Sequence, residues 1–302
     1  MVAQGQSYPT TFLRNDSTFQ DPISNNFSVN NPQYPYKSIF VALLAALGLT
    51  RTLLTTATTF YVATNGSDSN NGLTSGAPWL TFAHAMSVLT GQYDFGGQNV
   101  TLQANAGHAN FTAQLAITPW VGGGTLTYDG GGGQISTTSA DAISVNGDGI
   151  IFTYRNVKLI TTTSGSCLNA INGCFVHQGI GVNLGASAGD HLLVQAFATL
   201  NIDASYTISG NFSAHVHANG QGGISTGTVN PIVTLTGTPA GTYFAYGSFI
   251  GFVFFTGSFS GASTITFKGF SFLNSAISDG GQGGVTWPGT NAVQLNRGGV
   301  VY

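Results

Sequence analysis

The chain has 302 residues and few charges: Asp, Lys and Arg together make up 6% of it, Glu is absent, and the formal net charge is −3. This composition argues against nucleic acid as a partner, because a phosphate-binding face needs clustered Lys or Arg. Apolar residues at 42% argue against wholesale disorder. The 43 glycines and the scarcity of good helix formers favour strands and turns.

Two segments precede the main body. Residues 1–37 are rich in Asn, Gln, Ser and Pro without an apolar period, so we expect an extended arm that lies along a partner. Residues 38–58 are expected to hold a short apolar helix over about 39–54, capped by Ser38. Its heptad-like spacing predicts an assembly seam, such as a three-helix bundle. The residues of this seam are Phe40, Leu43, Leu47 and Leu54.

The apolar run of this helix, residues 39–49, is too short to cross a bilayer, which needs about 20 residues. We therefore expect no membrane span, with a signal anchor as the alternative. The first twelve residues lack a basic stretch followed by an apolar run, so no secretion signal is predicted.

Residues 60–86 read FYVATNGSDSNNGLTSGAPWLTFAHAM. The start is strand-like, residues 65–72 have turn chemistry, and Pro78 precedes a helix predicted over about 81–89 and ended by Gly91. Oxygen ligands in residues 68–72 alternate as in calcium loops, but the bidentate Glu of such loops is missing. A plain turn is the favoured interpretation.

The strand "YV", the loop "NGSDSNNG" and the helix "PWLTFAHAM" resemble the first coil of right-handed parallel β-helix proteins of the pectate-lyase-like superfold. The resemblance covers about 30 residues and implies that the short helix caps the first coil. From residue 99 onward, short apolar segments of strand length end in polar turn residues, as in ISVNG (143–147) and LNAING (168–173). Turn signals recur every 8–12 residues, which predicts an all-β chain. We expect a right-handed parallel β-helix over residues 59–225, and the body of the chain has room for eight or nine coils of 20–25 residues.

Residues 226–302 are expected to form a Phe-, Thr- and Gly-rich C-terminal β region. Within it, the segment from VTLTGTPA (233–240) to AYGSF (245–249) resembles the carboxy-terminal regions of bacteriophage tail-fibre and tailspike-like proteins. Five Phe residues crowd positions 249–259. They predict either aromatic stacks in the core or a subunit interface. Trp287, Tyr243, Tyr246 and Tyr302 could stack on sugar rings, although scattered aromatics more often serve packing. Trp287 and Tyr302 are the candidate contacts for a glycan or receptor.

The most specific candidate for a metal site is the pair His215 and His217, separated by Val216. Residues i and i+2 of a strand share a face, so three such pairs in a trimer would place six imidazoles around an axis and could bind a transition metal. Such pairs resemble those of some phage tail-fibre tips. The alternative is two exposed or hydrogen-bonded histidines, and no other cofactor is expected.

No catalytic residues are predicted. The Asp residues mostly stand beside Gly, Ser or Asn, as turn residues do, and the calcium-and-base pattern of pectate lyases is not recognisable. Asp190-His191 suggests an acid–base pair, but adjacent strand residues point to opposite faces. Cys167 and Cys174 are expected to be buried thiols.

The favoured hypothesis is a homotrimeric structural protein of a bacteriophage virion, a tail fibre or tailspike made in the host cytoplasm. Residues 1–58 would bind other virion proteins, and the β-helix would contact a host surface glycan or protein. The alternatives are a polysaccharide lyase or hydrolase on the same scaffold and a surface adhesin, since a fold does not decide a function.

Overall fold

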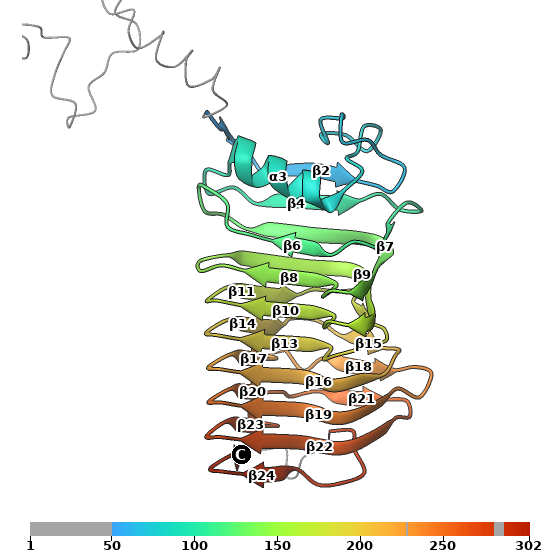
Figure 1. The fold of residues 1–302 in the computed structure, drawn as a ribbon, viewed down its shortest axis with the longest axis vertical. Helices are drawn as coiled ribbons and strands as arrows, with labels where there is room; N and C mark the ends of the chain where they lie inside the picture. Colours follow the sequence, from blue (N-terminus) through green and yellow to red (C-terminus); the bar gives the residue numbers. More distant parts are fainter. Residues whose placement is uncertain (1–49, 228, 281–286) are drawn as a thin grey trace, which may run out of the picture. The chain divides into compact units, whose positions relative to one another are not determined.

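A computed structural model describes residues 50–227, 229–280 and 287–302. From residue 52 onward these form a parallel β-helix, in which the chain winds into stacked coils (Figure 1). Every strand pairing in the described part of the chain is parallel, and one face carries eight strands in a single ladder, which corresponds to about eight turns. The expected all-β fold class is confirmed.

The coils present three faces. Face 1 is the eight-stranded sheet of β6 (Leu115–Ile117), β8 (Ile143–Asn146), β10 (Leu168–Ile171), β13 (Leu192–Gln195), β16 (Phe212–Asn219), β19 (Ala240–Ser248), β22 (Thr264–Phe272) and β24 (Gln294–Asn296). Face 2 continues β2 (Thr58–Val62) and β4 (Val100–Ala104) through β11 (Phe175–Gln178), β14 (Thr199–Ile202), β17 (Gly223–Ser225), β20 (Phe252–Phe254), β23 (Ala276–Ser278) and β25 (Val300–Val301).

Face 3 consists of β5 (Asn110–Phe111), β12 (Asn183–Leu184), β15 (Tyr206–Ile208), β18 (Ile232–Leu235) and β21 (Ser258–Ser260). The long strands β7 (Leu126–Ser139) and β9 (Ile151–Ser164) contribute to both face 2 and face 3. A register irregularity between Asp129 and Gly133 marks the bend in β7. The short strands β1 (Thr52–Leu53) and β3 (Tyr93–Asp94) pair separately.

Apolar residues at alternate positions fill the interior. On face 1, Leu168, Leu192 and Val216 lie in register on successive coils and are all fully buried. These residues are 24 apart in sequence, within the expected coil length. The next coil is longer, since Val216 pairs with Ala245. Each coil thus buries its apolar side on its neighbours, as a solenoid requires.

Asn and Gly residues form the corners between face 1 and face 2. Asn172 and Gly173, with φ of 63° and 74°, occupy the left-handed region that these residue types tolerate. Equivalent corners contain bulkier residues in the same region, including Phe249 and Ile250 with φ of 49° and 68°. The predicted turns at the ends of ISVNG and LNAING are therefore the corners of the coils.

The helix α3 (Phe82–Gln92) covers the N-terminal end of the stack (Figure 1). Thr81 is its N-cap, and the Thr81 hydroxyl accepts a hydrogen bond from the His84 N–H. Phe82 packs inward on the ring of Phe111, 4.2 Å between centroids. The capping helix predicted over 81–89 is confirmed; it spans residues 82–92, two residues longer than predicted, and continues past Gly91, where its end was expected.

The loop 65–72 is a structural turn that supports this cap. Asp68 accepts hydrogen bonds from the Leu80 and Thr81 N–H groups and from the Thr81 hydroxyl. Burial alone would raise the pKa of Asp68, but these hydrogen bonds hold it below its usual value. Gly72 is needed because a Cβ there would lie 2.4 Å from the buried indole of Trp79.

The apolar helix predicted over 39–54 does not extend to its expected end. Residues 52–53 form β1, because their backbone pairs with β3 beside the capping helix. Leu54 is buried in the hydrophobic core of the cap, whereas Phe40, Leu43 and Leu47 lie outside the described residues. Among the described residues, no helix has the length and apolar character that crossing a membrane requires.

Candidate functional site

The two predicted glycan contacts, Trp287 and Tyr302, differ in their exposure to solvent. Trp287 is 2% exposed, packs against the rings of Phe244 and Phe255, and donates its indole N–H to the Phe255 carbonyl. The prediction that Trp287 contacts a glycan is wrong, because its ring closes the core of the last coils. Tyr302 is 71% exposed and stays a prediction.

His215 and His217 do not share a face, which corrects the prediction from strand alternation. The inward and outward alternation of β16 is broken at residues 214–216, which are all buried, so the His215 ring lies inside the coil. The His217 ring lies on the outer side of face 1. This arrangement removes the geometric basis for six imidazoles around one axis. In the described part of the chain, no three His, Cys, Asp or Glu side chains are grouped so as to hold a metal ion.

His215 belongs to a buried hydrogen-bonded chain. The Tyr206 hydroxyl is 2.6 Å from His215 Nε2, and His215 Nδ1 is 3.1 Å from His191 Nδ1. His191 Nε2 is 2.7 Å from the carbonyl oxygen of Gly185. One proton order satisfies every contact: Tyr206 donates to His215, His215 donates to His191, and His191 donates to Gly185.

That proton order requires both imidazoles to be neutral. Burial lowers the pKa of His191 to about 4, because the charged form loses its hydration. Burial and the neighbouring His191 lower the pKa of His215 as well. Burial likewise raises the pKa of Tyr206, so the hydroxyl stays protonated as a donor. The chain is a satisfied core network, away from solvent.

On the outer side of face 1, three side chains from successive coils form a second chain. Asp190 Oδ2 is 2.6 Å from His217 Nδ1, and His217 Nε2 is 3.0 Å from the Ser248 hydroxyl oxygen. The Ser248 hydroxyl also donates a hydrogen bond to Asn219 Oδ1 at 3.2 Å. Asp190 additionally accepts the Ala214 N–H through Oδ1, which fixes the carboxylate. The order carboxylate, imidazole, hydroxyl is the arrangement that activates a nucleophile.

A ladder of half-buried aromatic rings adjoins this chain. His217 is in register with Tyr246 and Tyr246 with Phe270, and Tyr243 is in register with Phe267 on the same side. The Tyr246 ring stacks on His217 at 4.2 Å, and Phe270 lies 5.3 Å from Tyr246. We call Tyr243, Tyr246, Phe267, Phe270 and Phe272 the aromatic face. It lies on β19 and β22, which run side by side in Figure 1.

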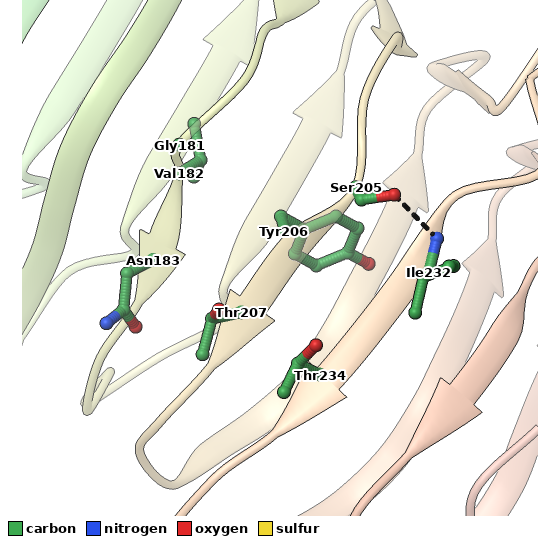
Figure 2. A pocket seen from close by; sticks show the side chains of 8 residues that line it. All are labelled: Gly181, Val182, Asn183, Ser205, Tyr206, Thr207, Ile232 and Thr234. Carbon is green, nitrogen blue, oxygen red and sulfur yellow. Dashed lines mark hydrogen bonds between the residues drawn. The ribbon is translucent and has the colours of Figure 1, made fainter.

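A hollow of about 420 Å³ lies on face 3, between β12, β15 and β18 (Figure 2). Its lining is Gly181, Val182, Asn183, Ser205, Tyr206, Thr207, Ile232 and Thr234. Asn183, Thr207 and Thr234 are in register, so their amide and hydroxyl groups form a polar row. The lining has no charge, and Tyr206 is 4% exposed with its hydroxyl engaged by His215. The hollow offers hydroxyl contacts without an exposed ring.

Other predicted features have structural roles. Cys167 and Cys174 are free and buried, as expected, and burial raises their pKa values to about 12 and about 11. Arg155 is near Asp148 in sequence, yet its guanidinium pairs with Asp129 on the preceding coil at 2.8 Å.

The Phe-rich segment has both buried and exposed rings, so part of it belongs to the core as predicted, and the subunit interface stays a prediction. Phe255 is fully buried in the core, whereas Phe249 and Phe252 are exposed. Phe residues therefore fall on both sides of these strands, as the crowding in GFVFF predicts.

Sequence reasoning missed Ser248 and the role of Asp190. The three residues of the outer chain are 27 and 31 positions apart, about one coil each, so they meet only when the coil register is known. A search for Asp, His and Ser at coil spacing would have found them. Tyr243 and Tyr246 of the aromatic face were predicted to stack on sugar rings, whereas Phe267, Phe270 and Phe272 were missed, because they come from the next coil.

Comparison of this chain with protein-family models finds no match. No curated protein and no solved structure matches it either. Function is therefore inferred from the geometry of faces 1, 2 and 3.

Proposed function

We propose that this chain is a glycan-binding structural protein, whose β-helix presents the aromatic face to a host surface glycan. The observation that carries the proposal is the row of half-buried rings on β19 and β22. Sugar rings have apolar faces that stack on Tyr and Phe, and their hydroxyls need polar partners nearby. Tyr hydroxyls and the Asp190–His217 pair supply such partners beside the rings.

The geometry of the rings supports an extended ligand. Tyr243 lies 5.5 Å from both Phe267 and Phe270, and Phe270 lies 6.0 Å from Phe272. Neighbouring rings stack on one another, with 21° between the planes of Tyr243 and Phe270 and 14° between those of Phe270 and Phe272, so the ladder presents a row of ring edges rather than a pocket for one small molecule. A repeating polysaccharide fits this shape better than a compact cofactor does.

Binding to a panel of bacterial surface polysaccharides tests the proposal. The wild-type chain should bind at least one member, and Tyr246→Ala should weaken binding by about 1 kcal/mol, roughly fivefold in Kd. The matched control is Phe197→Ala, because Phe197 is an exposed ring at a corner away from the aromatic face. Equal weakening by both variants, or no binding by the wild type, would contradict the proposal.

We further propose that the protein is a homotrimeric appendage of a bacteriophage virion, attached through residues 1–58. Exposed apolar side chains on face 2 support self-assembly. Ile151 pairs with Phe175, and Phe252 and Val300 lie further along the same register line, beyond Thr199 and Gly223. Exposed apolar groups that gather on one face commonly mark protein interfaces.

Light scattering after gel filtration tests the assembly. A trimer is expected for the full chain, and Phe252→Asp should shift it toward the monomer, because the charge would be buried in the interface. Ser260→Asp, an exposed position on face 3, is the control. A wild-type monomer would refute the trimer.

A further inference from the structure

We propose that Asp190, His217 and Ser248 form a nucleophilic site that removes acyl groups from an esterified glycan. The inference deepens the proposed function and rests on it, since the aromatic face would hold the glycan chain beside the site. The ligand class is an ester of a sugar hydroxyl with a small acid, such as an acetyl ester.

The atoms meet in the order that acyl transfer needs. When Asp190 Oδ2 accepts from His217 Nδ1–H at 2.6 Å, Nε2 is free to accept, and it lies 3.0 Å from Ser248 Oγ. The Ser248 proton, which otherwise goes to Asn219 Oδ1, can then turn to Nε2. His217 is further held by stacking on Tyr246, at 18° between the ring planes. A carboxylate that orients an imidazole, which in turn activates a hydroxyl, is recognised by geometry and role rather than by fold.

The proposed reaction has two balanced steps. Ser248 Oγ attacks the ester carbonyl carbon while its proton passes to His217 Nε2, and the sugar alcohol leaves with that proton, so an acyl-serine forms. Water then attacks the acyl-serine, again giving a proton to Nε2. The carboxylic acid departs, and Ser248 recovers its proton from His217.

Asn219 orients the Ser248 hydroxyl. Its Oδ1 accepts a hydrogen bond from Ser248 Oγ–H at 3.2 Å. Asn219 and Ser248 are in register on adjacent strands, β16 and β19, which fixes their separation. The hydroxyl proton therefore has two acceptors within reach, Asn219 Oδ1 and His217 Nε2.

Access to Ser248 requires a side chain to move, because the residue is 2% exposed. The adjacent Phe249 is exposed and packs edge-on against Phe272, and Phe272 is in register with Ser248. The competing interpretation is a polar ladder that only stabilises face 1, like the Gln195–Asn169 hydrogen bond on earlier coils.

The test uses the full chain with a fluorophosphonate probe and with p-nitrophenyl acetate. The probe should label Ser248, located by peptide mass spectrometry, and the ester should be hydrolysed above the background rate. His217→Gln and Ser248→Ala should each reduce hydrolysis by 100-fold or more. Ser144→Ala is the matched control and should leave both readouts unchanged, since Ser144 lies on the outer side of face 1 without a histidine partner.

The outcomes separate this inference from the proposed function. If folded wild-type protein, checked by circular dichroism, is not labelled at Ser248, the nucleophilic site is refuted, and glycan binding stands or falls by the polysaccharide panel. Labelling that persists in His217→Gln would also refute it, because the serine would then react without its base. Labelling without glycan binding would support the acyl-transfer site and refute the glycan role of the aromatic face.

Discussion

Lowering the pH should destabilise the fold through the buried Tyr206–His215–His191 chain, at pH values above those at which carboxylates are protonated. Both imidazoles are neutral in the native state, with the pKa of His191 lowered to about 4. In the unfolded chain a histidine has a pKa of about 6.5. Below that value the unfolded state binds more protons, so the free energy of unfolding falls as the pH drops from about 6.5 toward about 4.

The magnitude follows from the two pKa values of His191. Between pH 8 and pH 5 the unfolded state gains about 2 kcal/mol relative to the native state from His191 alone. His215 also lowers the free energy of unfolding as the pH drops, because its pKa is lowered as well. Asp68 and Asp129 have lowered pKa values, so their contributions are lost only below their ordinary value near 3.8.

Urea titrations followed by tryptophan fluorescence at pH 5, 6, 7 and 8 measure this loss, with reversibility checked by dilution. His191→Gln retains a donor and an acceptor but cannot titrate. The decrease in its free energy of unfolding between pH 8 and pH 5 should therefore be about 2 kcal/mol smaller than that of the wild type. His177→Gln, on the outer side of face 2, is the matched control and should retain the loss from the buried chain. Parallel stability curves for the wild type and His191→Gln would refute the reasoning.

Three further predictions concern structural residues. Trp287→Ala should lower the free energy of unfolding by about 3–5 kcal/mol, since it empties a core site, and Trp287→Phe by less; equal urea midpoints would contradict this. Asp68→Ala should cost about 1 kcal/mol by removing the acceptor for Leu80 and Thr81, measurable by thermal unfolding, whereas an unchanged Tm would count against the cap. Cys167 and Cys174 should react with a thiol reagent only after denaturation, because both are buried and protonated at pH 8; rapid reaction of the native chain would be inconsistent with burial.

The fold was predictable because local chemistry repeats along the chain. Asn-Gly pairs such as Asn172-Gly173 mark corners that need a left-handed backbone, and alternating apolar residues mark strands that bury one side. The segment from Pro78 to Thr81 predicts the start of the capping helix. The end of the helix predicted over 39–54 was not predictable, because Thr52 and Leu53 pair with residues some 40 positions away.

The site was much less predictable than the fold. Alternation placed His215 and His217 on one face, but the local irregularity of β16 turns His215 into the core, where Tyr206 and His191 satisfy it. Trp287 looked like a surface aromatic because Gly and Pro surround it. Contacts between coils decide both cases, and a single sequence without the register does not contain them.

The claim that the aromatic face binds glycan is tested most directly by hydroxyl-radical footprinting with a polysaccharide that the chain binds. We predict that Tyr243, Tyr246 and Phe270 lose reactivity when the polysaccharide is present, while Phe197 keeps its reactivity. Protection confined to the hollow on face 3, or unchanged reactivity of the aromatic face at saturating polysaccharide, would contradict the account.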